Sequence, residues 1–164
     1  MDSARGSDKM SLKRPKRDLD AVFETAGVKA GLQIWRIEEL FMVPVPKNEY
    51  GTFYVGDSYI VLFTEIFRSG QKKWDLHFWL GSTSTQDERG AAAVITYQLD
   101  DFLGGGPIQH RELEGNESSK FLHYFKAGIR YKEGGIDGGF NVVEQNRRLI
   151  ARCLHVKGKA RKVQ

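Results

Sequence analysis

Carboxylates that stand next to glycines are the residues of this sequence most suited to chemistry. Asp57 follows Gly56, and the pair Asp100 and Asp101 is followed by glycines at 104–106. Carboxylate and accessible carbonyl oxygens are the ligands that Ca²⁺ prefers. The spacing matches no EF-hand loop, so a calcium site would have to be assembled from distant segments; solvated surface carboxylates are the alternative. Further carboxylates that could contribute to such a site are Asp87, Glu88, Glu117 and Asp137.

The sequence gives little support for a catalytic site or a transition-metal site. The four histidines lie at 77, 110, 123 and 155, and none has the partner spacing of a zinc motif. The glycines at 104–106 follow a helical pattern, whereas a phosphate-binding loop opens a helix. No nucleophile elbow is present, and the one cysteine, Cys153, excludes an internal disulfide framework. The sequence therefore favours a binding protein over an enzyme.

Charge is distributed unevenly along the 164 residues. Residues 1–17 carry +4 and residues 147–164 carry +7, which leaves −7 for residues 18–146 because the whole chain carries +4. Nucleic-acid binding would rest on the two basic ends alone, and we expect none. No apolar run is long enough for a membrane helix or follows the pattern of a signal peptide, which favours a cytoplasmic protein.

The apolar pattern predicts a mixed sheet with helices on its faces. Helical periodicity predicts a long helix over 86–103 and a shorter one over 117–128. Within strand 73–81, alternation predicts a half-exposed His77. Residues 1–20 are basic and without periodicity, and we expect a flexible extension. The strand candidates are 31–40, 41–46, 52–56, 57–67, 73–81 and 107–115, with 140–144 as a further candidate.

The predicted long helix has apolar residues on two faces. One face is an ordinary core stripe of Ala92, Ile95, Leu99, Phe102 and Leu103. The opposite face should be polar if it met only water, yet it combines small, β-branched and aromatic residues with a polar rim. Either this face packs under another loop of the same domain, which periodicity alone favours, or it enters a groove on a partner. Its residues are Gly90, Val94, Tyr97, Gln98 and Asp101.

Several stretches together resemble the gelsolin family, specifically the first domain of gelsolin, severin and fragmin, and most of all the compact severin and fragmin proteins. The resemblance covers about residues 23–160. The most specific part is the motif QDE-x-G-x-A-A followed by LDD. The matching stretches are AGLQIWRIE (30–38), VPVP (43–46), GTFYVGDSYIVL (51–62), DLHFWLG (75–81), TQDERGAAAVITYQLDDFLGGGPIQHRE (85–112) and GGIDGGFNVV (134–143).

The resemblance implies an α/β (α+β) gelsolin-like domain, a five- or six-stranded mixed sheet between one long and one short helix. It places the domain at 21–146, after the basic extension 1–20. The basic segment 147–164 would lead to a second domain. The implied function is calcium-dependent binding to actin in a capping or severing protein of the actin cytoskeleton. The long helix would insert its second face into the barbed-end cleft of actin.

The resemblance also implies two calcium sites. One, within the domain, would use the Gly56 and Ile136 carbonyls with the carboxylates of Asp57 and Glu88. The other would be completed by a carboxylate of actin. Its ligands from this chain would be Asp100, Glu117 and the carbonyls of Gly105 and Pro107.

Basic stretches at 126–132 and 151–162 resemble the phosphoinositide-responsive segments of the family. Mixed basic and apolar residues can hold anionic headgroups. A phosphoinositide-binding membrane adaptor is therefore the alternative function, and a solvated tail is the alternative structure. The lipid-binding residues would be Lys126, Arg130, Lys132, Lys157, Lys159, Arg161 and Lys162.

Overall fold

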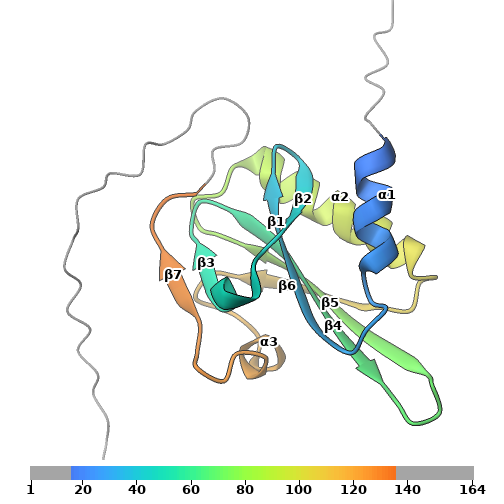
Figure 1. The fold of residues 1–164 in the computed structure, drawn as a ribbon. Helices are drawn as coiled ribbons and strands as arrows, with labels where there is room; N and C mark the ends of the chain where they lie inside the picture. Colours follow the sequence, from blue (N-terminus) through green and yellow to red (C-terminus); the bar gives the residue numbers. More distant parts are fainter. Residues whose placement is uncertain (1–15, 136–164) are drawn as a thin grey trace, which may run out of the picture.

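The structure, a computed structural model, describes residues 16–135. In chain order these residues form α1 (Lys16–Thr25), β1 (Gly31–Glu38), β2 (Phe41–Pro44), the 3₁₀ turn η1 (Lys47–Glu49), β3 (Thr52–Tyr54), β4 (Ser58–Ile66), β5 (Lys72–Leu80), α2 (Gln86–Phe102), β6 (Ile108–Leu113), α3 (Ser119–His123) and β7 (Arg130–Lys132). Figure 1 shows these elements along the chain.

Five strands form one mixed sheet in the order β2-β1-β4-β5-β6. The first three pairings are antiparallel, whereas β6 pairs parallel with β5, from Asp75 opposite Ile108 to Leu80 opposite Leu113. The helix α2 supplies the crossover that a parallel pair requires. A separate parallel pair joins β3 to β7. The predicted mixed sheet of five or six strands is confirmed, with five strands.

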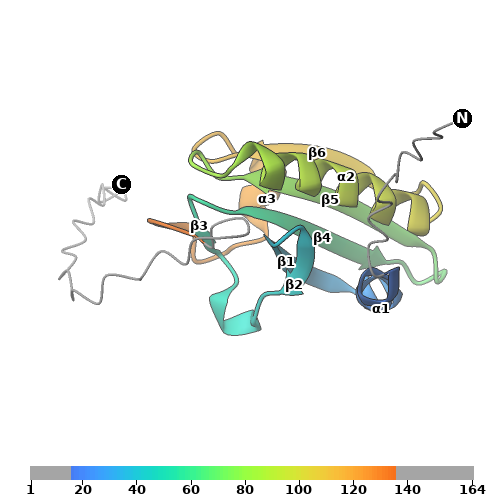
Figure 2. The same cartoon turned by 90° about the horizontal axis from the view of Figure 1, so that it is seen from above.

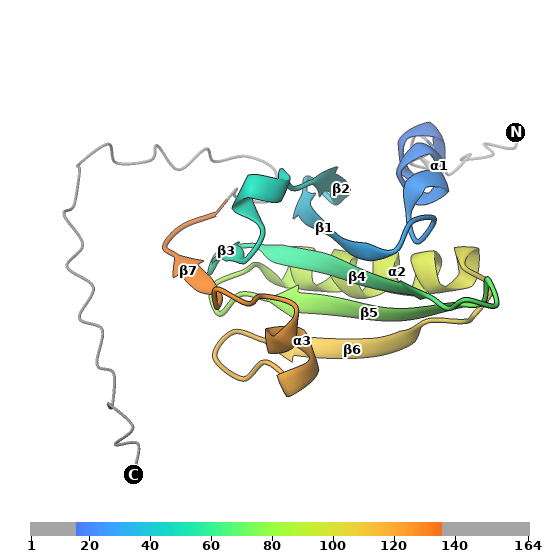
Figure 3. The ribbon, with the colours of Figure 1, turned by 60° about the horizontal axis from the view of Figure 1, so that its bottom comes forward.

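Each face of the sheet has its own apolar core because successive strand residues point to opposite faces. Under α2 and α1, Ala92, Ile95 and Leu99 pack against strand residues such as Ile60 and Leu76. On the other face, α3 contributes Phe121 to an aromatic cluster with Phe53, Tyr59, Trp79 and Phe125. Figures 2 and 3 show the sheet with α2 along one face and α3 on the other.

The short helix is shorter than the predicted range of 117–128. Ser118 caps it by accepting a hydrogen bond from the Phe121 amide, but the helix ends at His123. The chain then turns, with Gly128 in the left-handed region at φ 82°, so that the Arg130 amide can donate to the Gly51 carbonyl. This turn starts β7, a strand that the sequence analysis did not predict.

The N-terminal helix α1 was also not predicted. It begins at Lys16, inside the segment expected to be a flexible extension, and Phe23 and Ala26 at its end are buried against the core on the α2 side. Phe102 was predicted to belong to the core stripe of α2. It is instead 50% exposed, with its ring centroid 5.6 Å from that of Phe23.

The polar network under α3 corrects the prediction for His77, which is fully buried. Its Nδ1 lies 2.8 Å from Glu112 Oε1, and its Nε2 lies 2.9 Å from the Tyr124 hydroxyl. The ring also stacks on His110 at 4.4 Å between centroids. Burial lowers the pKa of His77, although the hydrogen bond to Glu112 acts against that shift. The network ties β5 and β6 to α3.

Within residues 16–135, no helix combines the length and the apolar character that a bilayer span needs.

Candidate functional site

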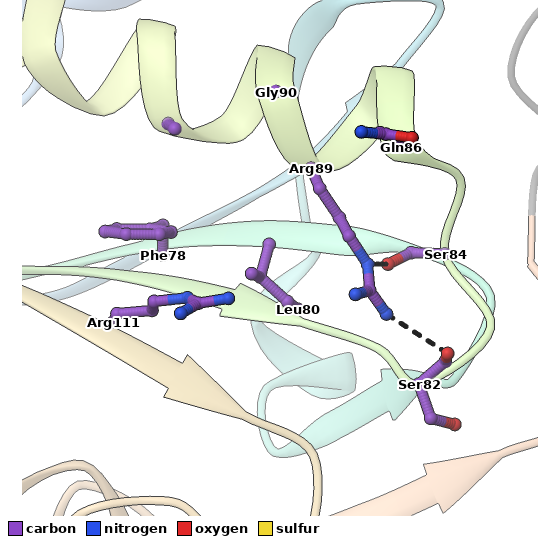
Figure 4. A pocket seen from close by; sticks show the side chains of 9 residues that line it. Phe78, Leu80, Ser82, Ser84, Gln86, Arg89, Gly90 and Arg111 are labelled. Carbon is purple, nitrogen blue, oxygen red and sulfur yellow. Dashed lines mark hydrogen bonds between the residues drawn. The ribbon is translucent and has the colours of Figure 1, made fainter.

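The N-terminal end of α2 is fixed to the loop that follows β5. Thr85 caps the helix by accepting a hydrogen bond from the Glu88 amide at 3.2 Å. Arg89 reaches back, donating from Nε to Ser84 Oγ at 2.9 Å and from Nη2 to the Gly81 carbonyl at 2.8 Å. Figure 4 shows this guanidinium over the loop. These contacts fix which side of α2 faces the sheet.

The second apolar face of α2 is exposed. Val94 is 49% exposed and Tyr97 is 68% exposed, and neither packs under another part of residues 16–135. Gly90, Gln98 and Asp101 are also exposed. Internal packing, which periodicity alone favoured, is therefore wrong for the described domain. These five residues are hereafter called the docking face.

Leu40 is an exposed apolar residue beside the docking face that the sequence analysis missed. It occupies a tight turn between β1 and β2, with φ of 46° at Glu39 and 67° at Leu40, and is 43% exposed. Leu40 lines a pocket of about 200 Å³ together with Ala91 and Val94. The available signal was the boundary between the strand candidates 31–40 and 41–46, because two consecutive antiparallel strands need a short turn between them.

The first predicted calcium set lies at the end of the sheet where β4 begins and β5 ends. Asp57 and Glu88 are both buried there. The loop that leads to Glu88 is fixed to this corner, because the Gly81 amide donates to the Asp57 carbonyl at 3.0 Å. The Arg36 guanidinium lies 3.7 Å from Asp57 Oδ2. Asp57 thus lies against the loop that leads into the first turn of α2, which carries Glu88.

Glycines around Asp57 leave room for backbone to approach its carboxylate. The Gly56 amide donates to the Gly134 carbonyl at 2.8 Å, and a Cβ at Gly135 would collide with Asp57 Oδ1. This close passage of a glycine segment fits a site built from carboxylates and carbonyls. Ile136, the fourth predicted ligand, lies outside the described residues. Residues 16–135 hold no cluster of three or more His, Cys, Asp or Glu side chains arranged for a metal, whereas the predicted set needs only two carboxylates.

The second predicted calcium set is brought together only in part. Asp100 lies at the end of α2, and the Gly105 amide donates to its carbonyl at 2.9 Å. Gly104 and Gly105 have φ of 78° and 73°, which turns the chain back towards Pro107. Asp100 Oδ1 is buried without a hydrogen-bond partner among the described residues, while Gln109 donates to Oδ2. An oxygen ligand is thus available in this turn.

Glu117 does not join that turn. The parallel strand β6 carries the chain from the turn to the opposite end of β5, a distance of roughly 17 Å for five residue steps. There the Glu117 carboxylate accepts hydrogen bonds from Trp79 Nε1 at 2.9 Å and the Tyr131 hydroxyl at 2.7 Å. The structure therefore brings Asp100 together with the backbone of Gly105 in this turn, apart from Glu117.

Three of the seven predicted lipid-binding residues lie in the described part of the chain. Lys126, Arg130 and Lys132 are exposed, and the last two belong to β7. The Lys132 ammonium lies 5.6 Å from the centre of the Tyr54 ring. The other four, Lys157, Lys159, Arg161 and Lys162, lie outside the described residues.

Comparison with known proteins gives consistent matches. The gelsolin repeat family matches residues 41–122. Gelsolin of Gallus gallus is 58% identical over 139 residues, covering 85% of this chain and 18% of that protein. Cytoplasmic gelsolin of Homarus americanus is 56% identical over 137 residues, covering 84% and 18%. Gelsolin of Drosophila melanogaster is 50% identical over 154 residues, covering 93% and 19%. This chain therefore spans only 18–19% of the length of these relatives.

A solved structure shares the fold. A chain of the crystal structure of the Thorarchaeota 2DGel3/rabbit actin complex superposes with a TM-score of 0.55 at 22% identity. The match covers 68% of this chain and 51% of that one.

Proposed function

This chain belongs to the gelsolin family, and from that premise we propose that it is an actin-binding domain that inserts α2 into the barbed-end cleft of actin. The observation that carries the proposal is the exposed apolar docking face, with Val94 and Tyr97 at its centre. A helix that already covers a sheet with one face has no internal use for a second one. A helix face of this kind fits a hydrophobic groove on a partner.

The composition of the docking face supports this assignment. Tyr97 is an aromatic residue with a polar tip, the type most often found at the centre of strong interfaces. Gln98 and Asp101 supply a polar rim, and Gly90 lets a partner approach the helix backbone closely. Leu40 extends the apolar surface beyond the helix. The proposed role is binding, without catalysis.

We also propose that calcium controls this domain through two sites. Asp57 and Glu88 with the carbonyls of Gly56 and Ile136 would hold an ion within the domain. Asp100 with the carbonyls of Gly105 and Pro107 would hold a second ion, which a carboxylate of actin would complete. Because the second turn ends the helix that carries the docking face, ion binding there would couple directly to actin binding.

Capping and severing are proposed for a whole protein to which this domain contributes. Binding to actin monomers and to the barbed end needs only the docking face, so these two activities are expected of the domain itself. The expected location is the cytoplasm, at the actin cytoskeleton. The alternative role, a membrane adaptor for phosphoinositides, would use exposed Lys126, Arg130 and Lys132 together with the C-terminal basic segment.

Sedimentation velocity with monomeric actin tests the proposal. The domain should form a one-to-one complex in calcium and a weaker one in chelator. Val94→Asp should weaken this complex strongly, because an unpaired carboxylate would be buried in the barbed-end cleft of actin. Leu122→Asp is the matched control, since Leu122 is 42% exposed on α3, on the face of the sheet opposite to α2. Equal affinities for the two variants would remove the docking face from the interface.

A further inference from the structure

A basic cleft lies between α2 and β6, on the flank of the docking face. It has a volume of about 760 Å³, and the side chains of Phe78 and Leu80 form part of its floor. Arg89 from α2 and Arg111 from β6 both line it, and Ser82 lies at its rim. Figure 4 shows both guanidinium groups within this cleft. No aspartate or glutamate lines it, although this part of the chain is acidic overall.

The two arginines play different parts. Arg89 is held by Ser84 Oγ and by the carbonyls of Gly81 and Ser82, so its charge is fixed in place. Arg111 is exposed, and its guanidinium has no ion pair within residues 16–135. Strand alternation turns Arg111 to the α2 side, because Glu112 points the other way and accepts from Ser118 under α3. Arg111 therefore presents an unneutralised charge beside a second, fixed one.

The cleft is continuous with the docking face. Gly90 belongs to the docking face and also lines the cleft, and no atom outside its own stretch of helix backbone lies within 4 Å of the place its Cβ would occupy. Ala93, one turn further along α2, lines the cleft as well. A partner seated on Val94 and Tyr97 would thus cover the open side of the cleft. Any group of that partner at this border meets two guanidinium groups.

We propose that this cleft receives a carboxylate side chain of the same partner that covers the docking face, with Arg111 as the contact that selects it. This inference rests on the proposed function and adds to it an electrostatic contact outside the apolar face. The planar guanidinium fork suits a carboxylate, which it can bind with two parallel hydrogen bonds. A charge at the rim of an interface acts mainly on the association rate and on its dependence on salt.

Stopped-flow association with monomeric actin tests the cleft. Arg111→Ala should slow association roughly two- to fivefold at low ionic strength, and the difference should shrink at high ionic strength. Arg111→Lys keeps the positive charge but removes the planar guanidinium group, so an association rate between those of the unchanged domain and Arg111→Ala is expected. Arg68→Ala is the matched control, because Arg68 is exposed in the β4–β5 turn, and its rate should stay close to that of the unchanged domain.

The outcomes separate the cleft from the docking face. Rates and salt dependence of Arg111→Ala equal to those of Arg68→Ala would overturn the cleft proposal and leave the docking face standing, provided that Val94→Asp still weakens the complex. Self-association of Arg111→Ala with an unchanged rate would mean that this arginine only protects the edge strand β6, which also overturns the proposal. If the unchanged domain fails to bind actin, the proposed function and the cleft proposal fall together.

Discussion

Truncation of Tyr97 gives a quantitative test of the docking face. An aromatic side chain buries roughly 150–250 Å² when it is fully covered. Because Tyr97 is 68% exposed, about 140 Å² of it remains for a partner to cover. At about 25 cal/mol per Å², this area corresponds to roughly 3.5 kcal/mol. Interfaces return less than this because ordering and desolvation oppose binding, so we expect Tyr97→Ala to cost about 2 kcal/mol, or roughly thirtyfold in affinity.

The exposure of Tyr97 also predicts that Tyr97→Ala has little effect on the free energy of unfolding. Substitution of a side chain without buried contacts changes the free energy of unfolding by about 0.5 kcal/mol or less. Titration of labelled monomeric actin with the domain gives the affinity, and urea unfolding gives the stability. Leu122→Ala on α3 is the control, since Leu122 is 42% exposed on the other side of the sheet. The reasoning is refuted if Tyr97→Ala keeps full affinity, or if it loses affinity only in proportion to lost stability.

Three further predictions concern calcium, protons and lipid. Calcium should raise the melting temperature of the domain, and Asp57→Ala combined with Glu88→Ala should abolish that rise; a rise that persists would move the ion elsewhere. Burial lowers the pKa of His77 below its ordinary value of 6.5, so just below that pH the unfolded chain binds more protons than the folded one. The free energy of unfolding should therefore be highest above about pH 6.5 and fall as the pH drops. This group can account for a fall of at most about 1.4 kcal/mol per pH unit. His77→Gln should flatten this slope in urea unfolding at several pH values, whereas His123→Gln, at an exposed histidine, should not; equal slopes would assign the titration to another group. Neutralising Lys126, Arg130 and Lys132 should reduce co-sedimentation with anionic vesicles, and undiminished binding would remove them from any lipid site.

Local patterns predicted the elements whose signals are contained within one segment. The strands β4 and β5 and the helix α2 have long and regular apolar periods, so their positions agree with the sequence to within a few residues. Periodicity also separated the two faces of α2. It could not decide whether Val94 and Tyr97 meet another loop, because that depends on where distant segments lie.

The missed features depend on pairing between distant segments. The strand β7 has three residues, and its partner β3 lies about eighty residues earlier in the chain. Glu117 was grouped with Asp100 because the family resemblance implied a shared site, but the parallel direction of β6 separates them. His77 was expected to be half-exposed because strand alternation predicts only which face of the sheet a residue points to. It does not predict that a helix, here α3, covers that face. The turn at Leu40 depends on a left-handed backbone that leucine seldom adopts.

Cross-saturation from unlabelled actin to the labelled domain in calcium tests the central claim most directly, because it reports which residues touch the partner. Saturation should reach Val94, Tyr97 and Gln98 on α2, together with Leu40. Residues around α3 and β7, on the other side of the sheet, should show none. Saturation concentrated on α3 and β7, with α2 unaffected, would contradict the assignment of α2 as the helix that enters actin.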